Sequence, residues 1–163
     1  MKILVLSDSH SMLEFMRTSI EKVKPDMMIH LGDFYQDALQ MQQEYPNIPL
    51  IHVPGNCDRY RCAPDAAETL VREICGVRFF LTHGHLHRVK WSTFQLIGDA
   101  KKAGADIVLY GHTHQAECYQ DKSGMWVMNP GTCGYYGATA GIIDIQNEKI
   151  VRCWVINQRF LEE

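Results

Sequence analysis

Two histidines separated by one residue, His112 and His114, follow an apolar run and a glycine in the stretch Leu-Tyr-Gly-His-Thr-His at 109–114. Imidazole nitrogens are common metal ligands, and residues two apart on an extended chain point to the same face. The pair therefore fits a metal site at the end of a buried strand. Two solvated loop histidines are the alternative, and ligand-type residues elsewhere in the chain decide between the two interpretations.

Five further residues of ligand type each follow the end of a predicted strand. They are Asp8, His10, Asp33, Asn56 and His83. In α/β proteins sites are built at the carboxyl ends of the strands. The full set binds through oxygen or imidazole nitrogen, which suits Mn, Fe, Zn, Ni or Co without choosing among them. Seven ligands are about what two ions need, and two ions about 3.5 to 4 Å apart clamp the oxygens in phosphoryl chemistry.

Apolar runs and helical spacing predict the elements that must position these ligands. The predicted strands cover 3–6, 27–31, 50–53, 69–74, 77–82, 107–110, 116–120, 125–128, 138–145 and 150–156, and the predicted helices cover 11–23, 37–45 and 91–105. Strands alternate with helices in the first half, which favours a largely parallel sheet, whereas the second half is richer in hairpins. We predict an α/β fold, a two-sheet α/β/β/α sandwich.

Length and composition indicate one ordinary globular domain over residues 1–163. Apolar residues make up 46% and charged residues 21%, and the net charge of −3 gives no broad attraction for nucleic acid. The N-terminal apolar run is too short and too soon interrupted for a signal peptide or a membrane span, so we expect a cytoplasmic protein without a membrane partner. Six cysteines without a Cys-x-x-Cys pair are expected to be reduced and mostly structural.

Five short motifs carry a family resemblance. In chain order they are Asp8-Ser9-His10, Gly32-Asp33, Gly55-Asn56-Cys57-Asp58, Thr82-His83-Gly84-His85 and Gly111-His112-Thr113-His114, and Asn129-Pro130-Gly131-Thr132 follows them. Their order and residue types resemble the calcineurin-like metallophosphoesterases, specifically the small YfcE-like phosphodiesterase branch.

The resemblance implies two divalent metal ions, with Mn²⁺ expected first and Ni²⁺, Fe²⁺, Zn²⁺, Co²⁺ or Mg²⁺ as alternatives. One ion would be held by Asp8, His10, Asp33 and His114. The other would be held by Asp33, Asn56, His83 and His112, with Asp33 as the bridge. The implied reaction is hydrolysis of a phosphoester by in-line attack of a hydroxide that bridges both metals.

One position departs from the wider superfamily, in which many members carry a histidine where this chain has Cys57. That histidine is taken to stabilise the transition state or to protonate the leaving group, and a thiol cannot be a cationic donor. We therefore expect a preference for a small phosphodiester substrate over monoesters. His85 is a candidate for a partial replacement, so Asn56, Cys57 and His85 are the candidate catalytic residues, although a passive role for Cys57 and an outer position for His85 stay open.

Two other functions remain as alternatives. A non-catalytic protein-interaction scaffold is one, because the retromer subunit shares the fold that this chain resembles and has lost part of the ligand set. A nuclease is the other, but no basic, aromatic-interleaved groove is visible in the sequence. A homodimer or homotetramer is expected from the resemblance, with Tyr135, Tyr136 or Trp154 as contacts.

Several residues near these motifs receive plainer interpretations. His30 and His52 lie inside apolar strands and are expected to be satisfied core histidines, whereas His87 is expected at the surface. Arg59 and Arg61 could bind a substrate phosphate or lie solvated in a loop. The methionines at 12, 16, 27, 28 and 41 are expected to fill the core.

Overall fold

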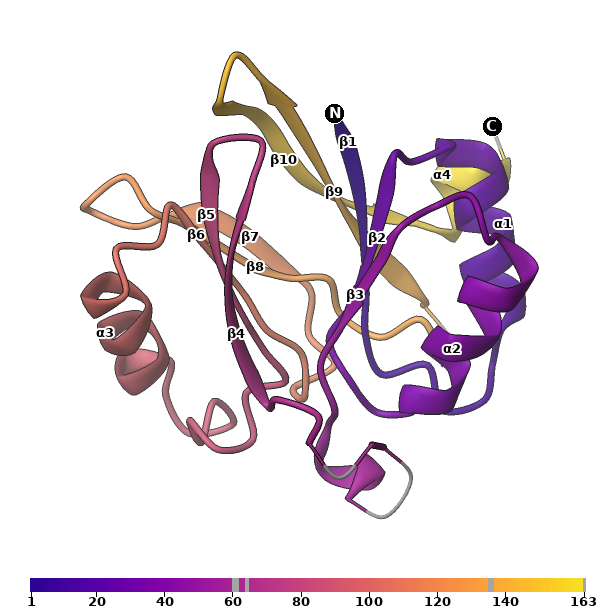
Figure 1. The fold of residues 1–163 in the computed structure, drawn as a ribbon, viewed down its shortest axis with the longest axis horizontal. Helices are drawn as coiled ribbons and strands as arrows, with labels where there is room; N and C mark the ends of the chain where they lie inside the picture. The colour runs from indigo at the N-terminus through magenta and orange to yellow at the C-terminus, as the bar shows by residue number, and fades with distance from the viewer. Residues whose placement is uncertain (60–61, 64, 135–136, 163) are drawn as a thin grey trace.

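The computed structural model describes residues 1–59, 62–63, 65–134 and 137–162. Two five-stranded sheets pack face to face, with α1, α2 and α4 outside one sheet and α3 outside the other (Figure 1). This arrangement is the predicted α/β/β/α sandwich. The predictions for Arg61, Tyr135 and Tyr136 lie outside the described residues.

The first sheet has the order β10-β9-β1-β2-β3. Its strands are β1 (Lys2–Leu6), β2 (Met27–His30), β3 (Leu50–His52), β9 (Thr139–Gln146) and β10 (Lys149–Asn157). β1, β2 and β3 run parallel, β9 pairs antiparallel with β1, and β10 pairs antiparallel with β9. The parallel part corresponds to the alternation of strands and helices in the first half of the sequence.

The second sheet has the order β4-β5-β6-β8-β7. Its strands are β4 (Thr69–Ile74), β5 (Val77–Thr82), β6 (Ile107–Leu109), β7 (Glu117–Gln120) and β8 (Trp126–Asn129). β5, β6 and β8 are parallel, while β4 and β7 pair antiparallel with their neighbours. Because β5 and β6 run the same way, the loops after them emerge at the same edge of this sheet.

Alternate residues of β1 show how the sequence forms the layers. Ile3 and Val5 pack into the core between the two sheets, whereas Leu4 and Leu6 pack under the helices. Successive side chains of a strand point to opposite faces, so a continuous apolar run is what a strand buried on both sides requires. The strand is thus fixed between two apolar layers, and its end, which carries Asp8, is fixed with it.

The helices are α1 (Glu14–Val23), α2 (Tyr35–Glu44), α3 (Phe94–Lys102) and α4 (Gln158–Glu162), with a 3-10 turn, η1, at Asn56–Asp58. The prediction that a helix starts at residue 11 is wrong, because His10 and Ser11 have φ values of 46° and 66°, which an α-helix does not contain. The helix predicted over 91–105 is shorter as observed, since hydrogen-bonded turns occupy 84–92. α4 and η1 were not predicted.

Some predictions of burial are wrong. Phe94 follows the apolar spacing of its helix but is 85% exposed, whereas Leu96 and Ala100 of the same helix are buried. Met12 is exposed rather than part of the core. His87, expected at the surface, is buried against Phe80, where its ring packs edge-on. These side chains depend on loops and neighbouring layers that helical spacing does not specify.

The two strand histidines differ from each other. His30 is buried and hydrogen-bonded on both ring nitrogens, accepting from the Gly32 N–H and contacting Ser9 Oγ, so that prediction holds. His52 is only half-buried, and its Nδ1 has no hydrogen-bond partner among the described residues, so it is not a satisfied core histidine. No helix in the described ranges is long and apolar enough to cross a membrane.

Candidate metal centre

Loops from both sheets bring the seven predicted ligands to one edge of the sandwich. Asp8 and His10 follow β1, Asp33 follows β2 and Asn56 follows β3 in the first sheet. His83 follows β5, and His112 and His114 follow β6, in the second sheet. The first sheet therefore supplies the oxygen ligands and His10, whereas the second sheet supplies imidazoles alone.

Left-handed backbone conformations concentrate at this edge. Five of the seven residues have positive φ angles, namely Asp8 (54°), His10 (46°), Asp33 (43°), His112 (69°) and His114 (60°). Non-glycine residues rarely adopt this region, and each instance costs on the order of 1–3 kcal/mol. Asp and His enter this region more readily than most residues, but five instances at one edge exceed that preference. The surrounding hydrogen bonds hold these residues there, and the conformations turn their side chains toward one another.

The first ligand group consists of Asp8, His10 and His114, whose ligand atoms lie within 4.8 Å of one another. Asp8 Oδ2 accepts hydrogen bonds from Ser7 Oγ and the His112 N–H, while the buried Asp8 Oδ1 faces the histidine rings. His114 Nε2 lies 3.1 Å from this Oδ1 and 3.4 Å from His10 Nε2. A carboxylate oxygen and two imidazole nitrogens converging in this way fit a divalent cation.

The second ligand group consists of Asp33, His83 and His112, again within 4.8 Å. His83 Nδ1 lies 2.7 Å from the carbonyl oxygen of Leu31 and must donate to it, which leaves the Nε2 lone pair directed at the site. Asn56 Oδ1 lies 3.1 Å from His83 Nε2 and joins this group. A backbone carbonyl that fixes the tautomer of a ligand histidine is a common feature of metal sites.

The two groups adjoin, because His83 Nε2 lies 3.5 Å from Asp33 Oδ2 and 3.9 Å from Asp8 Oδ1. Burial lowers the pKa of His83, but the neighbouring carboxylates of Asp33 and Asp8 outweigh this effect and raise it. By these distances Asp33 belongs to the second group. Its role as a bridge between two ions stays a prediction.

Carboxylates that were not predicted as site residues hold the ligand loops in place. Asp58 is buried and accepts hydrogen bonds from the backbone N–H groups of Asp33, Tyr35 and Gly55. Asp58 thereby ties the loop after β2 to the loop after β3. Asp37, in α2, ties the loop after β1 to that helix, since its Oδ2 accepts hydrogen bonds from Ser9 Oγ and the Ser11 N–H. Asp58 closes the Gly-Asn-Cys-Asp motif at 55–58, whereas Asp37 looks like an ordinary helix residue in the sequence.

The last residue of β8 and the segment after it support both ligand loops of the first group. Asn129 Nδ2 donates to the Gly111 carbonyl and to Thr113 Oγ1, in the loop that carries His112 and His114. Thr132 Oγ1 donates to the carbonyl oxygen of Asp8. The sequence contained the signal, because these residues open and close the Asn-Pro-Gly-Thr motif, but their contacts 16 to 124 residues away in the chain could not be deduced from it.

The three candidate catalytic residues lie around the second group. Cys57 is exposed, and its backbone N–H donates to Asp33 Oδ1. Partial burial and the nearby Asp33 carboxylate raise the pKa of the Cys57 thiol to about 11, so it is protonated at neutral pH. His85 Nε2 lies 3.6 Å from Glu68 Oε2, and its ring centre is 5.4 Å from that of His83. His85 is therefore beside the ligand group and outside it.

A cavity of about 470 Å³ opens beside Asn56. Its lining includes Arg59, Glu68, His85 and Leu86, so it combines charged groups with an apolar side. Through Asn56 the cavity adjoins the second ligand group.

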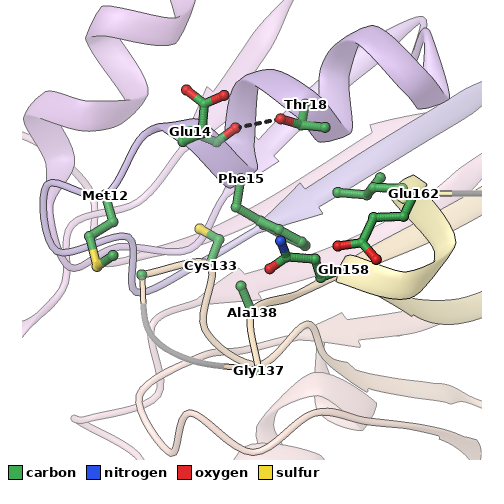
Figure 2. A pocket seen from close by; sticks show the side chains of 11 residues that line it. Met12, Glu14, Phe15, Thr18, Cys133, Gly137, Ala138, Gln158 and Glu162 are labelled. Atoms are coloured by element: carbon green, nitrogen blue, oxygen red, sulfur yellow. Dashed lines mark hydrogen bonds between the residues drawn. The ribbon is translucent and has the colours of Figure 1, made fainter.

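A more apolar pocket of about 410 Å³ lies between α1, α4 and the connection from β8 to β9 (Figure 2). Phe15, Cys133 and Ala138 line it, with Met12 at one side and Gln158 and Glu162 at the other. Its lining contains none of the seven predicted ligands. The cavity beside Asn56 is the candidate substrate cavity, because a predicted ligand lines it.

Residues 1–148 match the calcineurin-like phosphoesterase superfamily domain, and the chain belongs to this family. The chain is also 33% identical over 167 aligned positions to a phosphodiesterase of Methanocaldococcus jannaschii, covering 91% of this chain and 96% of that protein. The family and the two candidate metal sites place the chain with the metal-dependent phosphoesterases.

Solved structures agree on the fold. A structure described as a novel archaeal phosphodiesterase is 31% identical, with a TM-score of 0.72 and coverage of 96% of this chain and 100% of that one. The wild-type Vps29 of Entamoeba histolytica, solved in complex with Zn²⁺, has a TM-score of 0.71 at 18% identity and covers 96% of this chain and 99% of that one. The second likeness shows the fold alone.

Proposed function

We propose that this chain is a dinuclear metal-dependent phosphodiesterase that acts on a small phosphodiester. The observation that carries the proposal is the pair of adjoining ligand groups, Asp8 with His10 and His114, and Asp33 with His83 and His112. Asp8 Oδ1 supports cation binding, because it is buried and faces the Nε2 atoms of His114 at 3.1 Å and His83 at 3.9 Å, which are metal-binding groups themselves. Two divalent cations bound there would activate water and neutralise the charge of the phosphate oxygens.

The chain's own residues have separate tasks in this proposal. The two groups and Asn56 would hold the ions, with Mn²⁺ as the first to test. His85 and Arg59 line the adjoining cavity and would contact the leaving group or its phosphate. Cys57, protonated at neutral pH, would offer only a weak neutral hydrogen bond. A leaving group that needs no strong proton donor suits such a site, which supports diesters over alkyl monoesters.

A protein-interaction scaffold is the second candidate function. It is supported by the structural likeness to Vps29, one structure of which contains Zn²⁺. Metal binding by itself therefore does not distinguish the two functions for this chain. The retained ligand set favours the enzyme, and turnover is the property that separates them.

The test is hydrolysis of bis-p-nitrophenyl phosphate by chelator-treated protein to which Mn²⁺, Zn²⁺, Ni²⁺ or Co²⁺ is returned. The enzyme proposal predicts turnover that depends on added metal and that falls at least a hundredfold in Asp33→Asn. His52→Asn is the matched control, because His52 lies in neither group, and it should keep its activity. A folded, metal-loaded protein without turnover on this diester or on p-nitrophenyl phosphate would instead support the scaffold.

A further inference from the structure

Two cysteines meet where the outer strands of the two sheets contact each other. Cys118 lies in β7, the outer strand of the second sheet, and Cys153 lies in β10, the outer strand of the first sheet. Their Sγ atoms are 3.1 Å apart, and both side chains are half-buried against the core between the sheets. A disulfide bond measures about 2.05 Å, so the two sulfurs need to approach by only about 1 Å.

The other cysteines of the chain have different surroundings. Cys57, Cys62 and Cys75 lie in loops and turns, and the Cys75 Sγ contacts the sulfur of Met1. Cys133 is fully buried, and its thiol donates to the Ser7 carbonyl. The pairing of Cys118 with Cys153 therefore involves two strands from different sheets rather than a general clustering of cysteines.

We propose that Cys118 and Cys153 form a dithiol–disulfide site that joins the two sheets when the protein meets a small disulfide such as oxidised glutathione. The Cys118 thiolate attacks one glutathione sulfur, the glutathione S–S bond breaks, and one glutathione leaves and takes up a proton. Cys153 then attacks the Cys118 sulfur and releases the second glutathione. Two electrons pass from the two thiols to the glutathione disulfide, and the two thiol protons end on the two reduced glutathiones.

The surroundings of the pair favour Cys118 as the attacking thiol. The neighbouring Cys153 lowers the pKa of Cys118 and outweighs the opposite effect of burial. β7 is an edge strand, and two of its four residues, Tyr119 and Gln120, are exposed, so a small disulfide can approach it. Thiol–disulfide exchange requires this combination of thiolate character and access.

The bond would have a measurable effect on the fold. The two cysteines are 35 positions apart, so the bond would close a loop of the chain that contains β8 and β9. It would also connect two outer strands that belong to separate sheets. A cross-link of this length restricts the unfolded chain and stabilises the native state. A rise of the melting temperature by roughly 5–10 °C is expected for a domain of this size.

The experiment treats the full chain with an excess of oxidised glutathione, blocks remaining thiols with iodoacetamide and maps the disulfides by peptide mass spectrometry. The expected product lacks two hydrogen atoms and yields one cross-linked peptide pair containing Cys118 and Cys153. Its melting temperature is raised, and dithiothreitol reverses the change. This readout is independent of phosphoesterase activity, so it can succeed or fail whatever the outcome of the diester test.

Variants separate the pair from the other thiols. Cys118→Ser and Cys153→Ser should each lose both the cross-link and the thermal shift, whereas the matched control Cys75→Ser should keep both. Mapping of the wild-type chain does not depend on how the variants fold. The proposal is overturned if glutathione remains attached to Cys118 or Cys153 without a cross-link, if the cross-link joins other cysteines, or if the cross-linked chain melts no higher than the reduced one.

Discussion

At the scale of single residues, we propose Cys57 as the position that affects the choice between diester and monoester substrates. Its backbone N–H holds Asp33 Oδ1, so the backbone supports the site whatever the side chain is. The side chain is a protonated thiol, because partial burial and Asp33 raise its pKa to about 11. The backbone of Cys57 therefore supports Asp33, whereas its side chain is available to the leaving group. Substitution of the side chain should alter the effect on the leaving group and keep the support for Asp33.

We expect Cys57→His to raise monoesterase activity relative to diesterase activity by roughly a hundredfold, the lower end of what a positioned general acid contributes. The histidine supplies a cationic proton donor. An alkoxide leaving group needs such a donor, whereas a more stable anion such as p-nitrophenolate leaves without one. The measurement is kcat/KM for p-nitrophenyl phosphate, an alkyl monophosphate and bis-p-nitrophenyl phosphate. Cys57→Ser is the control, and it should leave the ratio near that of the native chain. An unchanged ratio in the histidine variant would refute this account of the preference.

The division of the histidines between two ligand groups gives a second prediction at this scale. His10 and His114 belong to the same group, whereas His112 belongs to the other. The double variant His10→Ala/His114→Ala should therefore keep one ion per chain, and His112→Ala/His114→Ala should lose both. Metal content after gel filtration, measured by atomic emission, gives the count. Equal metal loss in both double variants would show that the groups do not act separately.

At the scale of elements, the strand ends position the ligands, but tight loop contacts finish the site. A Cβ on Gly55 would clash with the Asp33 carboxylate, and one on Gly111 would clash with Ser7 Oγ and Asp8 Oδ2. Neither glycine needs a left-handed φ, so here the absence of a side chain matters for space alone. The loops after β1, β2, β3 and β6 therefore approach one another at distances that only glycine permits.

The strand ends were predictable because each is marked by an apolar run that stops at a polar residue. The hydrogen bonds that lock the loops were not. In the sequence Asp37 looks like an ordinary helix residue, yet it accepts a hydrogen bond from the Ser11 N–H in the loop after β1. Likewise, the Asn129 side chain donates to the Gly111 carbonyl in the loop after β6. Local propensity carries no information about such partners, which the packing of distant elements decides.

Asn129 provides the prediction for this scale. Asn129→Ala removes two hydrogen bonds to the loop that carries His112 and His114 and leaves the Gly111 carbonyl without this donor. We expect a loss of about 1–3 kcal/mol in the free energy of unfolding and a fall in kcat of at least about tenfold, since small displacements of site groups are costly. Denaturant unfolding and steady-state kinetics measure these effects.

The matched control for Asn129 is Asn157→Ala, at the exposed end of β10, where the side chain accepts a long hydrogen bond of 3.4 Å from the Phe160 N–H. Stability and activity should both stay near native in this control. A decrease in stability without any decrease in kcat in Asn129→Ala would assign the residue to the fold and not to the positioning of the site.

At the scale of the whole molecule, the sequence predicted the layers better than it predicted which residues face solvent. A continuous apolar run such as Ile3–Leu6 is compatible with a strand between two apolar layers, and both layers are present. Phe94 and His87 show the limit. Phe94 follows the helical spacing yet is exposed, and His87 lies in a polar stretch yet is buried, because the turns at 84–92 decide how this segment returns to α3.

Each ligand group takes residues from both sheets, so bound metal should stabilise the whole sandwich. In the first group Asp8 and His10 come from the first sheet and His114 from the second, and in the second group Asp33 and His112 divide in the same way. A ligand that binds only the folded state at a hundred times its Kd adds about 2.7 kcal/mol. For a chain of this size that corresponds to a rise in Tm of roughly 5–10 °C.

We therefore expect chelator-treated protein to melt several degrees below the same protein in excess Mn²⁺, as measured by differential scanning fluorimetry. His112→Ala/His114→Ala, which removes a second-sheet imidazole from each group, should lose most of this difference. His52→Asn, outside both groups, should retain it. If the double variant gained as many degrees from Mn²⁺ as the native chain, the stabilising ion would have to bind elsewhere, and a metal centre that links the two sheets would be wrong.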